Sequence, residues 1–345
     1  GIDDNYFELG GDSIRSIQIL AQSKQAGLNF SLADLFNLQT IGRLSEQMAR
    51  IELVEAGVSA IDVAAFSLID KADRDALPPN VEDAYPLSKL QAGMLFHAEL
   101  AAETAVYHNV TSWQIEAPFD AAKLELAVQQ LSQKHTVLRS SIDLTSYSEP
   151  LQLVWPQVEI PVTLHDLRPL ATEAQAAELD RWVQQTISHK FDWTQPPLLR
   201  FHFFQRSETT FQMIMAEHHA ILDGWSVASL VTELFQTYSA LLRGTTITPA
   251  TAVPYREFVA AEQRTLASKT TRTFWQEMLA ESNVSQVPRL SMPKPEADLP
   301  ETAVHQTILT TEQVAQLSHV ALQAGVPLKS VLLAAHLKVR SMVTR

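Results

Sequence analysis

The sequence contains no cysteine among its 345 residues. This absence excludes a disulfide framework, a cysteine-ligated metal site and a thiol nucleophile. Basic residues are also few, since 26 Lys and Arg stand against 39 Asp and Glu, for a formal net charge of −13. Nucleic-acid binding needs clustered Lys and Arg to neutralise phosphates, so the charge balance argues against it.

Long apolar runs are missing as well. Without a stretch of about 18 or more apolar residues, the sequence predicts no transmembrane helix and no membrane partner. Its 46% hydrophobic and 19% charged residues are typical of a globular chain, for which we expect a cytoplasmic location. The start, Gly1-Ile2-Asp3-Asp4, has neither a Met nor a signal-peptide pattern, which favours a fragment of a longer polypeptide.

The hydrophobic pattern predicts a small helical unit, a linker and an α/β domain. Residues 1–53 form the helical unit, and the charged, proline-bearing stretch 54–82 reads as the linker. Beyond it, strands alternate with helices, which indicates an α/β sandwich with helices on one face of a sheet. The expected strands are 110–115, 137–143, 151–155, 199–204 and 211–216, and the expected helices are 121–134, 173–190, 226–242, 311–324 and 329–342. Ser226 is the expected N-cap of its helix, and Thr311 caps a helix that Gly325 ends.

Ser13 follows Gly10-Gly11-Asp12 where a helix begins. It could simply be an N-cap. It could also carry a phosphodiester, because free backbone N–H groups and the helix dipole favour an anion at that end.

The longer run Asp4-Asn5-Tyr6-Phe7-Glu8-Leu9-Gly10-Gly11-Asp12-Ser13-Ile14 resembles the core motif of the peptidyl carrier proteins of nonribosomal peptide synthetases. The resemblance extends through Leu35-Phe36 and Ile41-Leu44. It implies a small all-α carrier bundle over 1–53 that lacks the family's first helix. It also implies 4′-phosphopantetheine attached to Ser13, with Asp12 beside the attachment site.

The string His218-His219-Ala220-Ile221-Leu222-Asp223-Gly224 offers a second candidate site. Zinc ligation is one interpretation, because His219 and Asp223 are four residues apart, but no third ligand stands at motif spacing. Buried structural histidines are another. Catalysis is the third, since adjacent side chains of an extended chain point to opposite faces and one imidazole could face a cavity.

The whole string, with Trp225-Ser226 after it, resembles the central motif of condensation domains of the same synthetases. Three further stretches resemble other motifs of that family in the expected order: 85–95, 134–140 and 255–258. Two positions depart from the family pattern, Thr136 for a glutamate and Glu257 for an aspartate.

This resemblance implies a chloramphenicol-acetyltransferase-like condensation domain over 83–345, with a first lobe at about 83–260 and the start of an incomplete second lobe at about 261–345. It assigns catalysis to His219, with His218 as its neighbour. It makes Asp223 structural and pairs it with Arg139. No metal is implied.

The reaction implied is amide formation between a donor thioester on Ser13 and an amine on a downstream carrier domain. An α-amine with a pKa of about 7.7 to 8.0 is already partly neutral near pH 7.5, so little prior deprotonation is needed. We therefore expect His219 to position the amine and accept its proton late, with the Gly224 N–H as oxyanion donor.

The implied partners are an upstream adenylation domain, the downstream carrier domain and a phosphopantetheinyl transferase. Two alternatives remain open at this point. One is a dual epimerisation and condensation domain, because a Gly-Gly-Asp-Ser carrier motif is often seen beside epimerising modules. The other is a catalytically silent docking platform for enzymes that act on the carrier-bound substrate.

Overall fold

A computed structural model describes residues 63–100, 105–245, 252–280, 282 and 306–343. Among the first 50 residues it describes 1–7, 9, 11, 15–16, 19–20, 22–23, 27–28, 30, 34–35 and 38–50. The chain divides into two compact units, one made of 1–57 with 276–345 and the other of 58–275.

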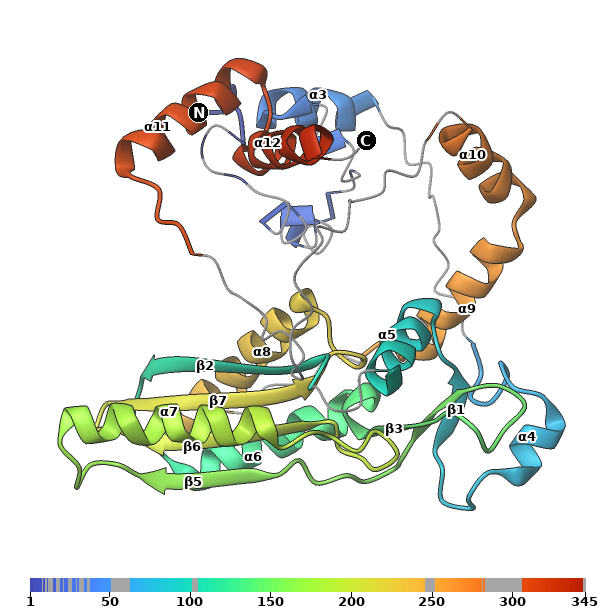
Figure 1. Ribbon diagram of the computed structural model, residues 1–345, viewed down its shortest axis with the longest axis vertical. Helices are drawn as coiled ribbons and strands as arrows, with labels where there is room; N and C mark the ends of the chain where they lie inside the picture. The colour runs from blue at the N-terminus through green and yellow to red at the C-terminus, as the bar shows by residue number, and fades with distance from the viewer. Residues whose placement is uncertain are drawn as a thin grey trace, which may run out of the picture. The chain divides into compact units, whose positions relative to one another are not determined.

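The unit 58–275 contains two β-sheets (Figure 1). The smaller is antiparallel, has the order β1-β4-β3, and consists of β1 (Asp83–Pro86), β3 (Ser140–Asp143) and β4 (Leu151–Val154). The larger has the order β2-β7-β6-β5 and consists of β2 (His108–Glu116), β5 (Val162–Asp166), β6 (Leu199–Gln205) and β7 (Thr210–His218). The β6–β7 hairpin confirms the prediction, whereas β1 and β5, which pairs in parallel with β6, are not predicted.

Helices α6 (Ala121–Lys134), α7 (Thr172–Ser188) and α8 (Gly224–Leu242) of the same unit lie where the apolar pattern predicts them. Helices α4 (Lys71–Ala76), α5 (Lys89–Leu100) and α9 (Tyr255–Ala267) of this unit are not predicted, nor is α10 (Lys269–Leu279), within which the boundary between the two units falls. The other unit contains α3 (Ile41–Arg50), α11 (Thr311–Ala324) and α12 (Leu328–Val343). The cap of α11 is Thr310, not the predicted Thr311, and it forms a capping box with Gln313.

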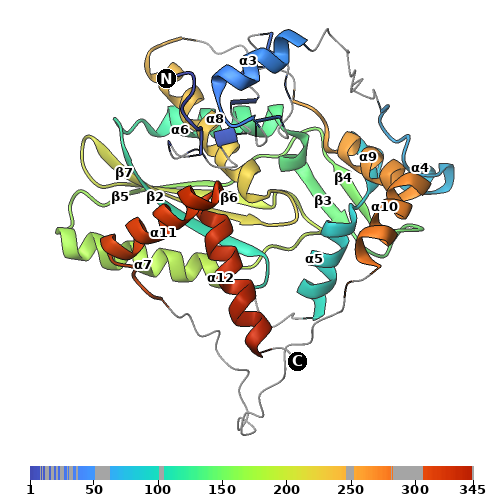
Figure 2. The ribbon, with the colours of Figure 1, turned by 90° about the horizontal axis from the view of Figure 1, so that it is seen from above.

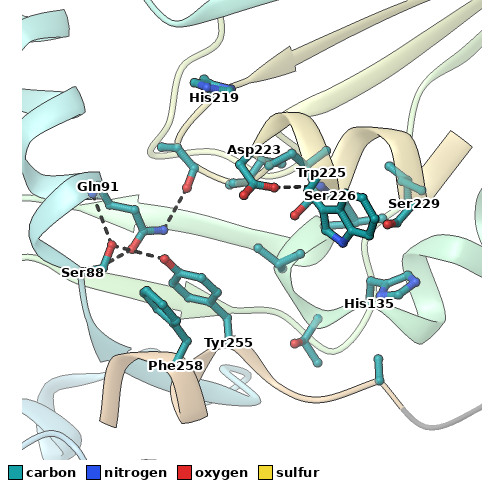
Figure 3. Close-up of a pocket in the computed structure, with 18 of the residues that line it drawn as sticks. Ser88, Gln91, His135, His219, Asp223, Trp225, Ser226, Ser229, Tyr255 and Phe258 are labelled. Carbon is teal, nitrogen blue, oxygen red and sulfur yellow. Dashed lines mark hydrogen bonds between the residues drawn. The ribbon is translucent and has the colours of Figure 1, made fainter. Parts of the chain in front are cut away.

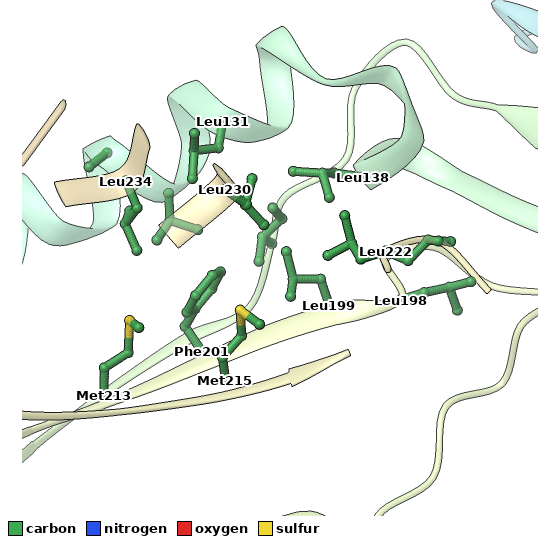
Figure 4. Packing of buried hydrophobic residues seen from close by; sticks show 14 of the residues in the cluster. Leu131, Leu138, Leu198, Leu199, Phe201, Met213, Met215, Leu222, Leu230 and Leu234 are labelled. Carbon is green, nitrogen blue, oxygen red and sulfur yellow. The ribbon is translucent and has the colours of Figure 1, made fainter. Parts of the chain in front are cut away.

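Helices cover both faces of the larger sheet, so the expectation of helices on one face is wrong (Figure 2). Side chains alternate between faces along a strand. Phe201 and Met213 therefore point into the core shared with α6 and α8 (Figure 4). Phe204 and Ile214 point the other way and pack against Leu179 of α7.

The predicted strand 137–143 begins as a turn of 3-10 helix, Thr136–Arg139, before β3. A short apolar run does not distinguish such a turn from a strand. The turn directs the side chain of Arg139 inward, where it is 5% exposed.

The described part of the predicted linker, 63–82, is folded against the smaller sheet. Phe66, Ile69 and Leu77 pack on the cluster formed by β1 and β4, and the Phe66 N–H donates to Asp83 Oδ1 at 2.9 Å. This stretch therefore contributes to the structure of the unit. The domain boundaries at 53/54, 82/83 and 260/261 stay predictions.

The described residues of the carrier region form a local network. The Tyr6 N–H donates to the Gln39 carbonyl at 2.7 Å, and Asn5 Nδ2 donates to Gln39 Oε1 at 2.7 Å. The Gly11 N–H donates to the Tyr6 carbonyl, and a Cβ at Gly11 would overlap the Tyr6 ring, so any larger residue there would displace that ring. Ser13 and Asp12 lie outside the described residues.

Among the described helices, none is by itself long and apolar enough to cross a membrane. The pair α11 and α12 meets the length and composition requirement only jointly, with a 99° bend between the two.

Candidate active site

The two histidines lie where β7 ends and α8 begins. His218 is the last residue of β7 and pairs with His108 of β2. The loop 219–223 follows, and Gly224 is the first residue of α8. This is the strand-to-helix junction that the sequence predicts.

Asp223, rather than the predicted Ser226, is the N-cap of α8. Its extended backbone lets Oδ1 accept a 2.7 Å hydrogen bond from the Ser226 N–H, which satisfies one of the free donors at the helix start. Hydrogen bonds from Ser226 hold the pKa of Asp223 below its usual value, against the opposing effect of partial burial. The Asp223 carboxylate therefore stabilises the start of α8.

The expected pair between Arg139 and Asp223 is wrong, because Arg139 is bound elsewhere. Its Nη2 lies 2.7 Å from Glu82 Oε2, Nε donates to the Trp155 carbonyl at 2.9 Å, and Nη1 donates to the Ser132 carbonyl at 2.7 Å. A second Nη1 bond, 2.9 Å long, reaches the carbonyl of the next residue. The arginine thus ties the end of α6 to β4 and to the segment before β1.

His219 lines a cavity of about 450 Å³ (Figure 3). The figure shows side chains converging on it from the start of α5, the loop 219–223, the first turns of α8 and the start of α9. Its polar lining includes Ser88, Gln91, Asp223 and Tyr255, and its apolar lining includes Met94, Leu138, Trp225, Leu230, Val253 and Phe258. Such a mixture suits a substrate held mainly by apolar contacts and oriented by a few polar groups.

His218 faces a different cavity, of about 290 Å³, on the other side of β7. Its side chain is 3% exposed, and its Nδ1 accepts a 3.2 Å hydrogen bond from the Ala220 N–H. Burial, with the charges of His108 and His219, lowers the pKa of His218 to about 4. The ring is therefore neutral near pH 7 and stands apart from the cavity that His219 lines.

His219 is held on its Nδ1 side. Nδ1 lies 3.1 Å from Asn109 Nδ2 and 3.7 Å from Glu217 Oε1, and the main-chain N–H donates to the Tyr107 carbonyl at 2.7 Å. The side chain is 31% exposed. Within the described part of the chain, Nε2 has no hydrogen-bond partner and is not among the buried atoms, so it is open to a substrate.

Glu217, to which no sequence motif pointed, supports this arrangement. It is 2% exposed, and its Oε1 accepts a 2.7 Å hydrogen bond from Asn109 Nδ2. Burial raises the pKa of Glu217, while the bond from Asn109 and the charge of His219 act in the opposite direction.

Gln91 lies within the first of the resembling stretches, but nothing in the sequence indicated its role. Its side-chain Nε2 donates to the Ala220 carbonyl at 2.9 Å and to Gln152 Oε1 at 2.8 Å. Ser88 completes the corner, because its Oγ accepts from the Gln91 N–H at 3.2 Å and from the Tyr255 hydroxyl at 3.2 Å (Figure 3). The only sequence signal for these contacts was that the three residues lie in the resembling stretches 85–95 and 255–258.

The resembling stretch 134–140 contributes two basic side chains to an ionic cluster at the cavity wall. Lys134 Nζ lies 2.5 Å from Glu233 Oε1, and His135 Nε2 lies 2.8 Å from Glu233 Oε2. Burial raises the pKa of Glu233, but the hydrogen bonds from Lys134 and His135 outweigh it, so the net shift is downward. Each oxygen of the Glu233 carboxylate thus has a basic partner.

Gly224 heads α8, as an oxyanion donor from a helix start requires. It is not among the residues that line the cavity, although its neighbours Asp223 and Trp225 are. Of the predicted site residues, the cavity therefore brings together His219 and Asp223, and the roles of Gly224 and His218 remain predictions. Within the described ranges, no group of three or more His, Asp or Glu side chains could hold a metal ion.

Two known protein families match the sequence of this chain. Residues 1–48 match the phosphopantetheine attachment site family, and residues 81–341 match the condensation domain family. The chain belongs to the condensation domain family. Its predicted order, a carrier domain followed by a condensation domain of a nonribosomal peptide synthetase, is thereby confirmed.

Similar proteins are large synthetases. The AMB antimetabolite synthetase AmbE of Pseudomonas aeruginosa is 36% identical over 343 residues, which is 97% of this chain and 16% of that protein. Bacitracin synthase 3 of Bacillus licheniformis is 26% identical over 241 residues, 69% of this chain and 4% of that protein. Nonribosomal peptide synthetase atnA of Emericella nidulans is 29% identical over 305 residues, 84% of this chain and 4% of that protein. The chain thus spans a small part of each relative.

Solved condensation domains share the fold. The starter condensation domain of the rhizomide synthetase RzmA superposes with a TM-score of 0.53 at 19% identity, over 60% of this chain and 50% of that one. The first condensation domain of the calcium-dependent antibiotic synthetase, in complex with substrate analogue 3a, gives 0.52 at 20% identity, over 59% and 49%. The predicted α/β, chloramphenicol-acetyltransferase-like fold is confirmed for the condensation domain.

Proposed function

We propose that this condensation domain joins a donor thioester on the carrier serine, Ser13, to an amine presented by a downstream carrier domain. The observation that carries the proposal is the His219 imidazole, which lines the 450 Å³ cavity with its Nε2 free of protein partners among the described residues. The amine nitrogen attacks the thioester carbonyl, the C–N bond forms and the C–S bond breaks. Alignment of two tethered reactants accounts for most of the acceleration.

Each residue of the site has a distinct task in this proposal. His219 contacts the reacting groups, and Asp223 fixes the first turn of α8 beside them through its bond to the Ser226 N–H. Arg139 holds the surrounding framework through its bonds to α6, β4 and Glu82. Ser13, with Asp12 before it, carries 4′-phosphopantetheine, which would supply the thioester sulfur.

The partners follow from the same chemistry. Synthetases of this family combine carrier, condensation and adenylation domains, so an adenylation domain would load the donor on Ser13. A phosphopantetheinyl transferase would first modify the serine. We place the reaction in the cytoplasm, with no nucleic acid, membrane or metal required.

The test uses the full synthetase that contains this chain. Ser13 is loaded with a donor by a phosphopantetheinyl transferase, an amine-bearing carrier domain is added, and the amide product is followed by mass spectrometry. His219→Ala should abolish product while leaving the loading of Ser13 intact, and Ser13→Ala should abolish both. Full product formation by His219→Ala would contradict the assignment, and absence of product from the unaltered, loaded enzyme would favour the docking-platform alternative.

A dual epimerisation and condensation activity is favoured by one feature, the aspartate before Ser13 in the Gly-Gly-Asp-Ser motif. Chiral analysis of the donor residue in the product distinguishes the two functions. Inversion of an L-donor would show that epimerisation precedes condensation, and retention would leave condensation alone.

A further inference from the structure

Three polar side chains meet beside the cavity in a fixed order: Glu217, Asn109 and His219. Asn109 of β2 pairs directly with Glu217 of β7 in the antiparallel ladder, which places their side chains on the same face. Asn109 Nδ2 lies 2.7 Å from Glu217 Oε1 and 3.1 Å from His219 Nδ1. One amide nitrogen thus lies between a carboxylate and an imidazole.

The hydrogen-bonding capacity of these groups determines which one donates. An ionised carboxylate only accepts, and an amide nitrogen has two N–H groups to give. Rotation of the Asn109 amide would place its oxygen against Glu217 Oε1 at the same 2.7 Å, where two acceptors would face each other. Burial raises the pKa of Glu217, so this orientation holds at a pH where its carboxyl is ionised. Under that condition the amide nitrogen must point at both neighbours.

This orientation leaves His219 Nδ1 as the acceptor of the second N–H. A neutral imidazole has one donor nitrogen and one acceptor nitrogen, so its proton must then be on Nε2. Nε2 has no partner within the described residues and belongs to a side chain that lines the cavity. The nitrogen that a substrate would meet is consequently a donor.

We propose that Glu217 and Asn109 are positioning residues that hold His219 as the Nε2–H tautomer, so that the imidazole donates a hydrogen bond to the thioester carbonyl. This inference rests on the proposed function for its substrate and on the geometry for its tautomer. A partner that fixes the second nitrogen of an imidazole sets both the tautomer and the ring orientation.

The consequence for the reaction is a change in the task of His219. As the amine nitrogen attacks, negative charge builds on the carbonyl oxygen, and a donor already aimed at that oxygen stabilises the charge. The C–N bond forms, the C–S bond breaks, and the proton lost by the amine leaves with the sulfur as a thiol. Nε2 already carries a proton in this tautomer, so it cannot also accept the proton of the amine, as the motif alone led us to expect.

The first test reads the tautomer directly in the unaltered 345-residue chain. The chain is labelled with ¹⁵N-histidine and studied by long-range ¹H–¹⁵N correlation at a pH of about 8, above the usual histidine pKa. The His219 signals are assigned from their loss in His219→Gln. We expect a protonated Nε2 and an unprotonated Nδ1; a proton on Nδ1, alone or together with Nε2, would refute the proposal. This measurement requires no variant at positions 109 or 217.

The second test removes the donor. Asn109→Leu keeps the approximate size of the side chain and removes both N–H groups without placing a second carboxylate beside Glu217. Glu217 Oε1, 3.7 Å from His219 Nδ1, is then the acceptor left near that nitrogen, which should move the His219 proton to Nδ1. Gln212→Leu is the matched control, since it removes an amide on β7 whose Nε2 bonds Ser112 Oγ at 2.8 Å. An unchanged His219 tautomer in Asn109→Leu would overturn the proposal, as would the same shift in the control.

The activity of the full synthetase supplies the third measurement. Asn109→Leu should lower kcat by about tenfold to a hundredfold with KM little changed and Ser13 loading intact, because the lost interaction belongs to the transition state. Unaltered kcat despite a moved proton would overturn the positioning role. Retained activity in His219→Ala, with the tautomer as expected, would instead refute the proposed function and leave the tautomer assignment standing.

Discussion

The side-chain amide of Gln91 donates a 2.9 Å hydrogen bond to the main-chain carbonyl of Ala220, 129 residues further along the chain. The same nitrogen donates to Gln152 Oε1, and the whole side chain is 3% exposed. Gln91 thus attaches α5 and β4 to the loop 219–223, in which His219 stands. The position of that imidazole depends on a residue far from it in sequence.

Gln91→Leu should destabilise the unit 58–275 by about 2 kcal/mol, since it leaves the Ala220 carbonyl and Gln152 Oε1 buried without a donor. Urea unfolding followed by tryptophan fluorescence measures the change. Gln212→Leu, at a partly exposed amide of β7, is the control and should change stability by less than about 0.5 kcal/mol. Equal effects of the two substitutions would argue against the anchoring role of Gln91.

Arg139 should be coupled energetically to Glu82 and not to Asp223. Arg139→Ala removes several hydrogen bonds of a buried side chain, so we expect a loss of about 3 kcal/mol in unfolding free energy and a lower melting temperature. In double-mutant cycles, Arg139 with Glu82 should show coupling of up to about 1 kcal/mol, because Glu82 is partly exposed. Arg139 with Asp223 should be additive within about 0.5 kcal/mol. Strong coupling of the second pair would restore the ion pair that the resemblance implies.

The cap formed by Asp223 leads to a separate prediction. Asn caps helices as well as Asp does, so Asp223→Asn should retain most of the stability, whereas Asp223→Ala should lose about 1 kcal/mol. An ion pair to an arginine would make the two substitutions nearly equal. Thermal unfolding of both variants in parallel distinguishes a cap from a salt bridge.

Two buried imidazoles predict acid sensitivity. Burial, with the charge of Arg200, lowers the pKa of His202 to about 4, and burial likewise lowers that of His218 to about 4. The unfolded chain therefore binds more protons than the native chain between a pH of about 6.5 and about 4, so stability falls as the pH drops through this window and the loss levels off below it. Each imidazole accounts for up to about 3 kcal/mol.

Urea unfolding at a series of pH values measures this effect, most cleanly above a pH of about 5, where few carboxylates titrate. His202→Gln should make the fall shallower, because one of the two neutral rings is gone. An identical pH dependence in the variant and the unaltered chain would show that His202 is not a source of acid sensitivity.

The sequence predicts well those elements whose pattern is local. The apolar spacing of α6, α7 and α8 and the hairpin of β6 and β7 identified them within a few residues. The helix start at α8 was placed late because Ser226 and Asp223 are both good caps, and only the extended backbone of Asp223 decides between them. β5 was not predicted because only Val162 and Leu164 of its five residues are apolar, too few for an alternating pattern to stand out.

The site was only half predictable for the same reason. His219 and Asp223 belong to one motif, so the sequence brings them together by itself. Asn109 and Glu217 are 108 residues apart, and no pattern relates them until the register of β2 against β7 is known. The Arg139–Asp223 pair failed because a resemblance supplies roles, while the contacts of a buried guanidinium depend on the carbonyls that happen to surround it.

His218 and His219 face different cavities, so the number of residues in β7 decides which imidazole meets the substrate. Each step along β7 turns a side chain to the other face of the sheet, and the ladder pairs His108 with His218. Insertion of a single residue before His218 would move His218 to the place that His219 now occupies, and would move His219 one place further into the loop. Such a chain would keep every chemical group of the site and still present the wrong histidine, so the spacing between the sheet and the loop is as much a determinant of activity as the histidines themselves.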